Sequence, residues 1–539
     1  MPWECAACTM INENDAFLAC ATCGTQRATQ KRAHEGENSA VAKPKRPCID
    51  LCGSDDDDEV ACLGSQGGAP AAAAAPSAPA APAAYAWRPL YSRALGSDSP
   101  GNAGAVSIAD IAMGRPRWVV VSNYMIDAQT LTRVWPALRD VERVIIFHGC
   151  ASTARGLQSA FPRAQIHDMK PEKLDFVHPV TGNPLKNVHK YGCHHSKFFL
   201  VGLDDSLRVA IHTANIIPTD IDNKAQGCFI QDFPAKPRDA TDASDFEDSL
   251  CRYVETLQVH AGGAARNWRD FGAAFDDTPA MDLAAALRRF DFSGARGRLV
   301  PSAPGCHMGA DLHAFGQNRV AKLLAAQGAG DAAASDEIVC QFSSFSSPSP
   351  RLLDQLAATF NPEGAPRAPL RLLWPTSAEV RDSVEGYAAG GCMPSSAKNV
   401  DKAPRDMLRR WTSPAASSAY VAARGRTMPH IKTWSRVSAD GADVRWSLLT
   451  SSNLSGAAHG LRQVKDSQLY IMHWELGVLV NSAAAGGALK TTQGRGGVVV
   501  PLPFRCPLEP YRAGDQPFVW SRDFDPDRFG RRGTGAKEY

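Results

Sequence analysis

Short runs of β-branched and aromatic residues alternate with amphipathic stretches over most of this chain. The runs with the composition typical of strands are Trp118–Val121, Arg143–Phe147, Lys197–Val201, Leu207–Ile211, Ile338–Phe342, Leu370–Trp374, Val444–Leu449, Gln468–Met472 and Leu476–Val480. Leu283–Phe290 and Asn318–Ala326 have instead the spacing of apolar residues that favours helices. This alternation predicts an α/β fold of α-β-α sandwiches around buried mixed sheets.

The same pattern divides the chain into segments. It is globular from about residue 106 to about residue 525, and Pro301, Pro304 and Gly305 interrupt it. We therefore expect two half-domains that meet near these three residues. The expected segments are a Cys-rich unit (1–30), a linker (31–105), a first half (106–300), a second half (301–525) and a frayed tail (526–539).

Residues 31–105 have the composition of a disordered linker. They hold an acidic run, Asp55–Glu59, and an Ala/Pro tract, Ala69–Ala84, and such a segment cannot bury enough apolar surface to fold. The basic cluster Lys43–Arg46 is either a nuclear localisation signal or a solvated charge cluster. Ile49–Leu51, followed by acidic residues, resembles a SUMO-interacting motif, which would add as a strand to a sheet edge.

The length, composition and net charge of the chain limit the classes of function. The chain has 539 residues, of which 44% are hydrophobic, so a large core is possible. Its net charge is +2, so a groove for nucleic acid must be a local feature rather than a global basic field. We expect neither a secretory signal nor a membrane span, because no apolar stretch follows Met1 and no long apolar run occurs. The scattered cysteines are typical of a reducing compartment.

The amino-terminal unit carries two C-x-x-C pairs at a spacing that suits one tetrahedral Zn²⁺. The four expected ligands are Cys5, Cys8, Cys20 and Cys23. So small a unit has almost no core, so a structural zinc ion would supply its folding energy; a redox or incidental cluster is the alternative. With Trp3, Asn12 and Arg27 the unit resembles Ran-binding-protein-2-type zinc fingers, although its segment from Asn12 to Cys20 is one residue longer. Fingers of this type bind single-stranded RNA or ubiquitin.

Two signatures of the same form carry the candidate chemistry. His195-Ser196-Lys197 and His430-Ile431-Lys432 each open a hydrophobic stretch, and each is followed by an asparagine, Asn215 or Asn453. In an extended strand, residues i and i+2 share a face, so each His and its Lys are expected on one side. A neutral imidazole can attack phosphorus, a protonated one can release the leaving oxygen, and lysines and amides can hold the phosphate. The duplication therefore predicts a phosphodiesterase with a covalent intermediate and no catalytic metal.

These signatures resemble the phospholipase D superfamily. Its commoner members carry H-x-K-x4-D, whereas here Gly202 and Val437 stand at the Asp positions. The form without that Asp is the pattern of the tyrosyl-DNA phosphodiesterase family, and the resemblance covers roughly residues 115–525. Its further blocks are Asn123–Met125, Phe147–Gly149, Tyr191–Lys197, Ile211–Asn215, Lys224–Gly227, Gln341–Ser344, Ser383–Tyr387, Met428–Thr433, Thr450–Ser455 and Glu475–Val478. The implied fold is two phospholipase D-like halves that form one active site.

The resemblance also implies roles for single residues. His195 would be the nucleophile and His430 the acid and later the base, while Gln226 and Glu475 would orient the two rings. The implied phosphate ligands are Lys197, Lys432, Asn215 and Asn453. The implied substrate contacts are Tyr191 as a stacking platform for DNA, Ser344, Ser347 and Ser455 on the backbone, and Trp520 beside the peptide. Cys392 stands where the family has a serine, which puts that phosphate contact in doubt.

The implied substrate is a 3′-phosphotyrosyl link at a single-stranded DNA end, the remnant of a stalled topoisomerase I. Such an enzyme is expected to be a nuclear monomer without a membrane partner. Two alternatives stay open: a phospholipase D-like nuclease or lipid phosphodiesterase, and a non-catalytic scaffold that binds ubiquitin, SUMO or RNA. The presence of both histidines and both lysines disfavours the scaffold.

Overall fold

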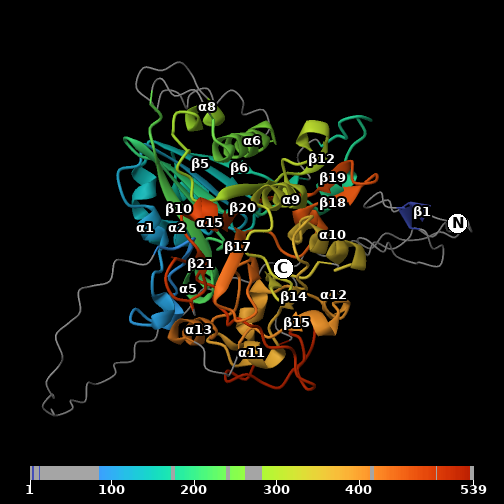
Figure 1. Cartoon of the computed structure of the whole chain (residues 1–539). Helices are drawn as coiled ribbons and strands as arrows, with labels where there is room; N and C mark the ends of the chain where they lie inside the picture. The colour runs from blue at the N-terminus through green and yellow to red at the C-terminus, as the bar shows by residue number, and fades with distance from the viewer. Residues whose placement is uncertain are drawn as a thin grey trace, which may run out of the picture.

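Two large mixed sheets with helices packed around them form the body of the protein (Figure 1). This computed structural model describes residues 3–4, 11–12, 84–171, 176–237, 243–260, 282–346, 348–412, 418–492 and 494–533. The expected zinc ligands, the linker signals and Ser347 lie outside these residues. Within them, no helix combines the length and the apolar composition that crossing a membrane requires.

The first sheet has the strand order β3-β10-β9-β8-β4-β5-β6. Its strands are β3 (Arg88–Pro89), β4 (Trp118–Asn123), β5 (Arg143–His148), β6 (Ala164–Asp168), β8 (Phe198–Gly202), β9 (Ser206–His212) and β10 (Gly227–Pro234). Strands β4, β5 and β6 are parallel, and the others join antiparallel to their neighbours. The helices α1 (Ile108–Ile111), α2 (Ala128–Val134) and α3 (Leu157–Ala160) contribute to a cluster on one face.

The second sheet repeats this topology strand by strand. Its order is β11-β20-β17-β16-β13-β14-β15, with β13, β14 and β15 parallel and the others antiparallel to their neighbours. Its strands are β11 (Arg298–Ser302), β13 (Glu337–Gln341), β14 (Leu370–Leu373), β15 (Leu408–Arg409), β16 (Thr433–Val437), β17 (Asp443–Thr450) and β20 (His473–Asn481). The two halves therefore have one architecture, as the duplicated signatures predict.

The remaining elements connect or extend the sheets. The helices are α4 (Lys186–Tyr191), α5 (Pro218–Asn223), α6 (Asp245–His260), α8 (Leu283–Leu287), α9 (Gly316–Gln327), α10 (Pro350–Phe360), α11 (Ser377–Arg381), α12 (Ala397–Val400), α13 (Ala419–Arg424), α14 (Gly456–His459) and α15 (Ser482–Ala485). The strands are β1 (Trp3–Glu4), β2 (Ile11–Asn12), β7 (Cys193–His194), β12 (Gly305–Met308), β18 (Leu461–Gln463), β19 (Gln468–Ile471), β21 (Leu489–Lys490) and β22 (Val498–Val499). Strand β7 of the first half pairs parallel with β20 of the second.

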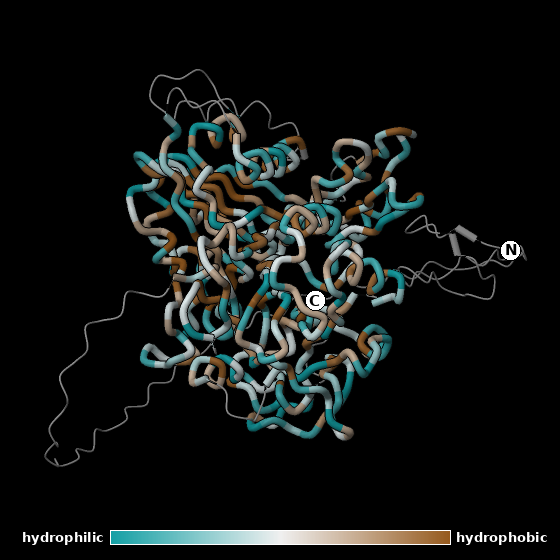
Figure 2. Tube along the Cα trace, in the orientation of Figure 1, coloured by the Kyte–Doolittle hydropathy of each residue, from teal (hydrophilic) through white to brown (hydrophobic). Residues whose placement is uncertain are grey.

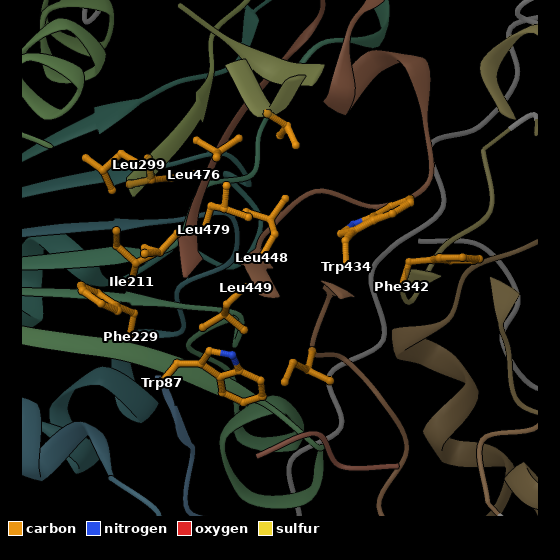
Figure 3. Packing of buried hydrophobic residues seen from close by; sticks show 14 of the residues in the cluster. Trp87, Ile211, Phe229, Leu299, Phe342, Trp434, Leu448, Leu449, Leu476 and Leu479 are labelled. Atoms are coloured by element: carbon orange, nitrogen blue, oxygen red, sulfur yellow. The ribbon is translucent and has the colours of Figure 1, made fainter. Parts of the chain in front are cut away.

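One hydrophobic core is shared by both halves. Ile211 and Phe229 of the first sheet belong to the same buried cluster as Leu449 and Leu479 of the second, and Figure 3 shows them side by side. In Figure 2 the brown of hydrophobic residues is clearest along the strands of the first sheet, at the upper left. Because burial of apolar surface is the main driving force of folding, this cluster holds the two halves against each other.

The strands and helices predicted from the periodic pattern are all present, with ends that differ by a few residues. Two other expectations need correction. Residues 84–105 belong to the fold rather than to the linker, because β3 pairs with β10 and Trp87 is buried in the shared core. Residues 526–533 are not frayed, because the Asp527 carboxylate accepts hydrogen bonds from the amides of Tyr387, Phe529 and Arg531. The predicted junction between residues 300 and 301 falls inside β11.

Candidate active site

Each His-x-Lys signature lies immediately before a strand, in the same position in both halves. Lys197 precedes β8 and Lys432 precedes β16, so the strand predicted to start at Lys197 starts one residue later. Each lysine folds back over its own signature, because Lys197 Nζ donates to the His195 carbonyl at 2.7 Å and Lys432 Nζ to the His430 carbonyl at 2.6 Å. The two lysines and the two histidines are close enough for charges in one half to act on groups of the other.

The two asparagines also hold equivalent positions. Asn215 follows β9 and Asn453 follows β17, each at the third residue after the strand ends. The Asn453 carboxamide oxygen accepts hydrogen bonds from the amide and the hydroxyl of Ser343, at 3.0 and 3.3 Å, which leaves its NH₂ group to a ligand. The Asn215 side-chain oxygen is buried without a hydrogen-bond partner among the described residues.

Packing explains why the superfamily Asp is missing. Gly202, at the first Asp position, lies against the Trp118 indole, and a Cβ there would come within 2.1 Å of the ring. Val437, at the second position, is buried in the shared core. At Gly202 there is no room for a side chain, and at Val437 a carboxylate would be buried among apolar residues, so the acidic partners come from elsewhere.

His195 receives its acidic partner from the opposite half. Its Nδ1 lies 2.9 Å from Oε2 of Glu475 on β20, and the Glu475 side chain is 1% exposed. Although burial favours the neutral acid, contacts with His195 and His473 hold the pKa of Glu475 well below its ordinary value. Burial, with help from Lys197 and Lys432, lowers the pKa of His195 to about 4 in spite of Glu475. His195 is therefore a neutral imidazole at neutral pH, which is the form that attacks phosphorus.

His430 has two neighbours at Nδ1. Gln226 Nε2 lies 3.1 Å away, as the sequence resemblance implies, and Asp220 Oδ2 also lies 3.1 Å away. Burial, followed by the charges of Lys432 and Lys197, holds the pKa of His430 well below its ordinary value. The sequence interpretation missed Asp220; the available signal was a pair of acids, Asp220 and Asp222, between Asn215 and Gln226, in a helix opened by Pro218.

Cys392 lies next to this centre. Its thiol contacts the carbonyls of Ala389 at 3.1 Å and Pro429 at 3.7 Å, and Pro429 directly precedes His430. Burial raises the pKa of Cys392 to about 12, so the group is a neutral thiol. It can offer only a weak hydrogen bond where the family serine offers a strong one.

The expected substrate contacts are more dispersed. Tyr191 ends α4 and is 39% exposed. Its backbone carbonyl lies 3.2 Å from His473 Nε2, and His473 Nδ1 lies 3.4 Å from Glu475 Oε1. Ser455 Oγ caps α14 by accepting from the Ala458 amide. Ser344 is partly exposed beside Ser343, whereas Trp520 packs against the shared core.

Phosphate binding should weaken at alkaline pH. Burial is the main cause that lowers the pKa of Lys197 to about 8 and of Lys432 to about 7. Below these values both ammonium groups are charged and attract a phosphate; above them the charges are lost. We expect kcat/KM for a phosphodiester substrate to fall as pH rises through this range. Lys432→Arg keeps its charge, so its profile should fall only near the pKa of Lys197. A profile that stays flat would contradict this assignment.

Comparisons with known proteins agree with this geometry. The profile of the family described as "Tyrosyl-DNA phosphodiesterase" matches residues 91–512. The chain is 31% identical over 467 residues to Tyrosyl-DNA phosphodiesterase 1 of Arabidopsis thaliana, a match that covers 78% of this chain and 72% of that protein. It is 31% identical over 381 residues to the Drosophila melanogaster protein of that name, with 65% and 62% covered.

The fold is also that of a solved structure. The crystal structure of yeast tyrosyl-DNA phosphodiesterase superposes with a TM-score of 0.57 at 16% identity and covers 81% of this chain and 99% of that one. At this identity the likeness concerns the fold. The match of the family profile over most of the chain is the stronger finding: the chain belongs to the tyrosyl-DNA phosphodiesterase family.

Proposed function

We propose that this protein is a DNA-repair phosphodiesterase that hydrolyses 3′-phosphotyrosyl links, the remnants of stalled topoisomerase I, and other blocked 3′ ends. The observation that carries the proposal is the paired set of His, Lys and Asn at one buried centre, with a carboxylate from the opposite half at each histidine. The names of the relatives state a tyrosyl-DNA phosphodiesterase activity for those proteins.

In the first step, His195 Nε2 attacks phosphorus and the bond from phosphorus to the tyrosyl oxygen breaks. The new P–N bond makes a phosphohistidine. Its positively charged ring keeps the proton on Nδ1, which donates a hydrogen bond to Glu475. His430 gives the proton from its Nε2 to the tyrosyl oxygen. The anionic substrate adds negative charge beside His430 and so raises the pKa of that imidazole, which supports protonation at the moment when it is needed.

In the second step, His430 acts as the base. Its Nε2, now unprotonated, takes a proton from a water molecule that attacks phosphorus, and the P–N bond breaks. The products are a 3′-phosphate end and the regenerated His195. Lys197, Lys432, Asn215 and Asn453 would hold the nonbridging oxygens in both steps, where fixed donors offset the developing charge.

The amino-terminal unit and the linker would serve targeting. We propose a structural Zn²⁺ on Cys5, Cys8, Cys20 and Cys23, because the two C-x-x-C pairs have the spacing of a tetrahedral zinc site. The finger would bind ubiquitin or RNA, Ile49–Leu51 would bind SUMO, and Lys43–Arg46 would direct the protein to the nucleus.

Cleavage of a labelled 3′-phosphotyrosyl oligonucleotide should persist in EDTA, because lysines and amides supply the charge that a metal supplies elsewhere. Metal analysis should find a single zinc ion before chelation and none after it. A double variant, Cys5→Ser with Cys8→Ser, should lose the zinc and keep the cleavage. Loss of cleavage in EDTA that Mg²⁺ restores would indicate a different mechanism.

A further inference from the structure

Each of the two catalytic histidines contacts a carboxylate that belongs to the opposite half. His195 of the first half contacts Glu475 of the second, at 2.9 Å. His430 of the second half contacts Asp220 of the first, at 3.1 Å. The Asp220 side chain is 3% exposed, so this contact is as deeply buried as the other. The family resemblance gives Gln226 and Glu475 as the partners of the two rings and gives no role to Asp220.

The orientation of Gln226 decides what it can do for His430. The amide of Gly227 donates to Thr213 Oγ1 at 3.0 Å, so the Thr213 hydroxyl is free to donate, and it lies 2.7 Å from Gln226 Oε1. Gln226 Oε1 is thereby engaged, and the NH₂ group faces His430 Nδ1. An NH₂ group is a donor and cannot accept a proton from Nδ1.

The reaction requires the opposite arrangement. As the acid, His430 is an imidazolium with protons on both nitrogens; after it donates from Nε2, it is neutral with its proton on Nδ1. As the base, it must receive a proton at Nε2, so Nδ1 is again protonated. Every competent state of His430 therefore needs an acceptor at Nδ1. Of the two groups that contact Nδ1 in the described part of the chain, Asp220 is the acceptor.

We infer that Asp220 is the positioning residue that holds the Nδ1 proton of His430 through both proton transfers, while Gln226 favours the resting tautomer. This inference rests on the proposed function. Asp220 Oδ2 also accepts a hydrogen bond from the backbone N–H of Asn215 at 2.9 Å. One oxygen atom therefore contacts both Asn215, a phosphate ligand of the first half, and His430 of the second half. Asp220→Ala would remove the hydrogen bond from the Asn215 backbone and the contact with His430, whereas Asp220→Asn removes the charge and keeps an oxygen in place.

The surrounding charges fit this role. Burial raises the pKa of Asp220, whereas the Asn215 amide and the ammonium groups of Lys224, Lys432 and Lys197 oppose that rise. Burial and these lysines, with His195, lower the pKa of His430. Because the pKa of Asp220 is raised and that of His430 is lowered, the two groups become more similar in proton affinity. The buried Cys392 thiol, a neutral group, lies near Asp220.

The test compares two leaving groups in single-turnover reactions with the full chain. One oligonucleotide carries a 3′-phosphotyrosyl group, and the other a 3′-nitrophenyl ester, whose leaving oxygen needs little acid help. Asp220→Asn should slow adduct formation from the tyrosyl substrate about 10–100-fold and from the nitrophenyl substrate by less than about threefold. A role in packing alone would slow both equally. Equal slowing, or no slowing of the tyrosyl substrate, would overturn the inference.

Asp222→Asn is the matched control, because Asp222 lies on the same helix and pairs with Arg133 away from the histidines. It should behave as wild type on both substrates. If the proposed function itself fails, wild type and Asp222→Asn will leave the tyrosyl substrate intact, which is a different result from a selective loss in Asp220→Asn.

A second measurement needs no variant of Asp220. Nitrogen-15 NMR of labelled histidines in wild type with inorganic phosphate, assigned by comparison with His430→Ala, reports the tautomer of His430. A proton on Nδ1 is expected. An unprotonated Nδ1 in the phosphate-bound protein would overturn the inference even if Asp220→Asn does not fold.

Discussion

Replacement of His430 by alanine should stop the reaction halfway. The tyrosyl oxygen, with a pKa of about 10, leaves with modest help, so adduct formation should continue at a reduced rate. Water attack needs the base, so we expect hydrolysis of the phosphohistidine to slow by about 10²–10⁴-fold. A labelled 3′-phosphotyrosyl oligonucleotide should then run on a denaturing gel as a DNA–protein adduct. Loss of activity without any adduct would refute the role of His430.

Two further variants make this result specific. His195→Ala should give neither cleavage nor adduct, because it removes the nucleophile. His307→Ala should leave both steps unchanged, since this histidine bonds the Ala303 carbonyl at 2.8 Å and takes no part in the catalytic set. An adduct in His195→Ala would place the covalent link on another residue.

Replacement of Glu475 by glutamine should have the second-largest effect. Glu475 raises the pKa of His195 against the effect of burial, so its loss should make that imidazole less basic and a weaker nucleophile. The glutamine can also turn its NH₂ group toward Nδ1 and favour the wrong tautomer. The corresponding change in a serine protease lowers kcat by about 10⁴-fold, and we expect about 10²–10⁴-fold here.

The measurement is the single-turnover rate of adduct formation in a His430→Ala background, where the adduct accumulates. Glu337→Gln is the control, because Glu337 pairs with Arg371 in β14 and contacts neither histidine. A rate within a few-fold of the parent would show that the contact at 2.9 Å does not support the nucleophile.

Local patterns predicted most of the fold because strands such as β4 and β17 are dense in apolar residues and bury them fully. Residues 84–105 were misjudged for the converse reason. An Ala/Pro tract precedes them, so the average composition of residues 31–105 is that of a linker even though Trp87 and Leu90 are apolar. These two side chains are buried where β3 pairs with β10. The order of the tail depends on Asp527 in the same way, through the amide of Tyr387, which is far away in the sequence.

The sequence by itself determined that there are two halves, that His, Lys and Asn occur in each, and that the superfamily Asp is missing. These features depend only on local spacing and residue type. Only the tertiary structure decided which acid serves which histidine. Glu475 and Asp220 reach across the interface to the opposite half, and neither is near its partner in sequence. Such a pairing depends on how two sheets pack around a shared core, and that packing brings a buried carboxylate to each imidazole where no single segment could.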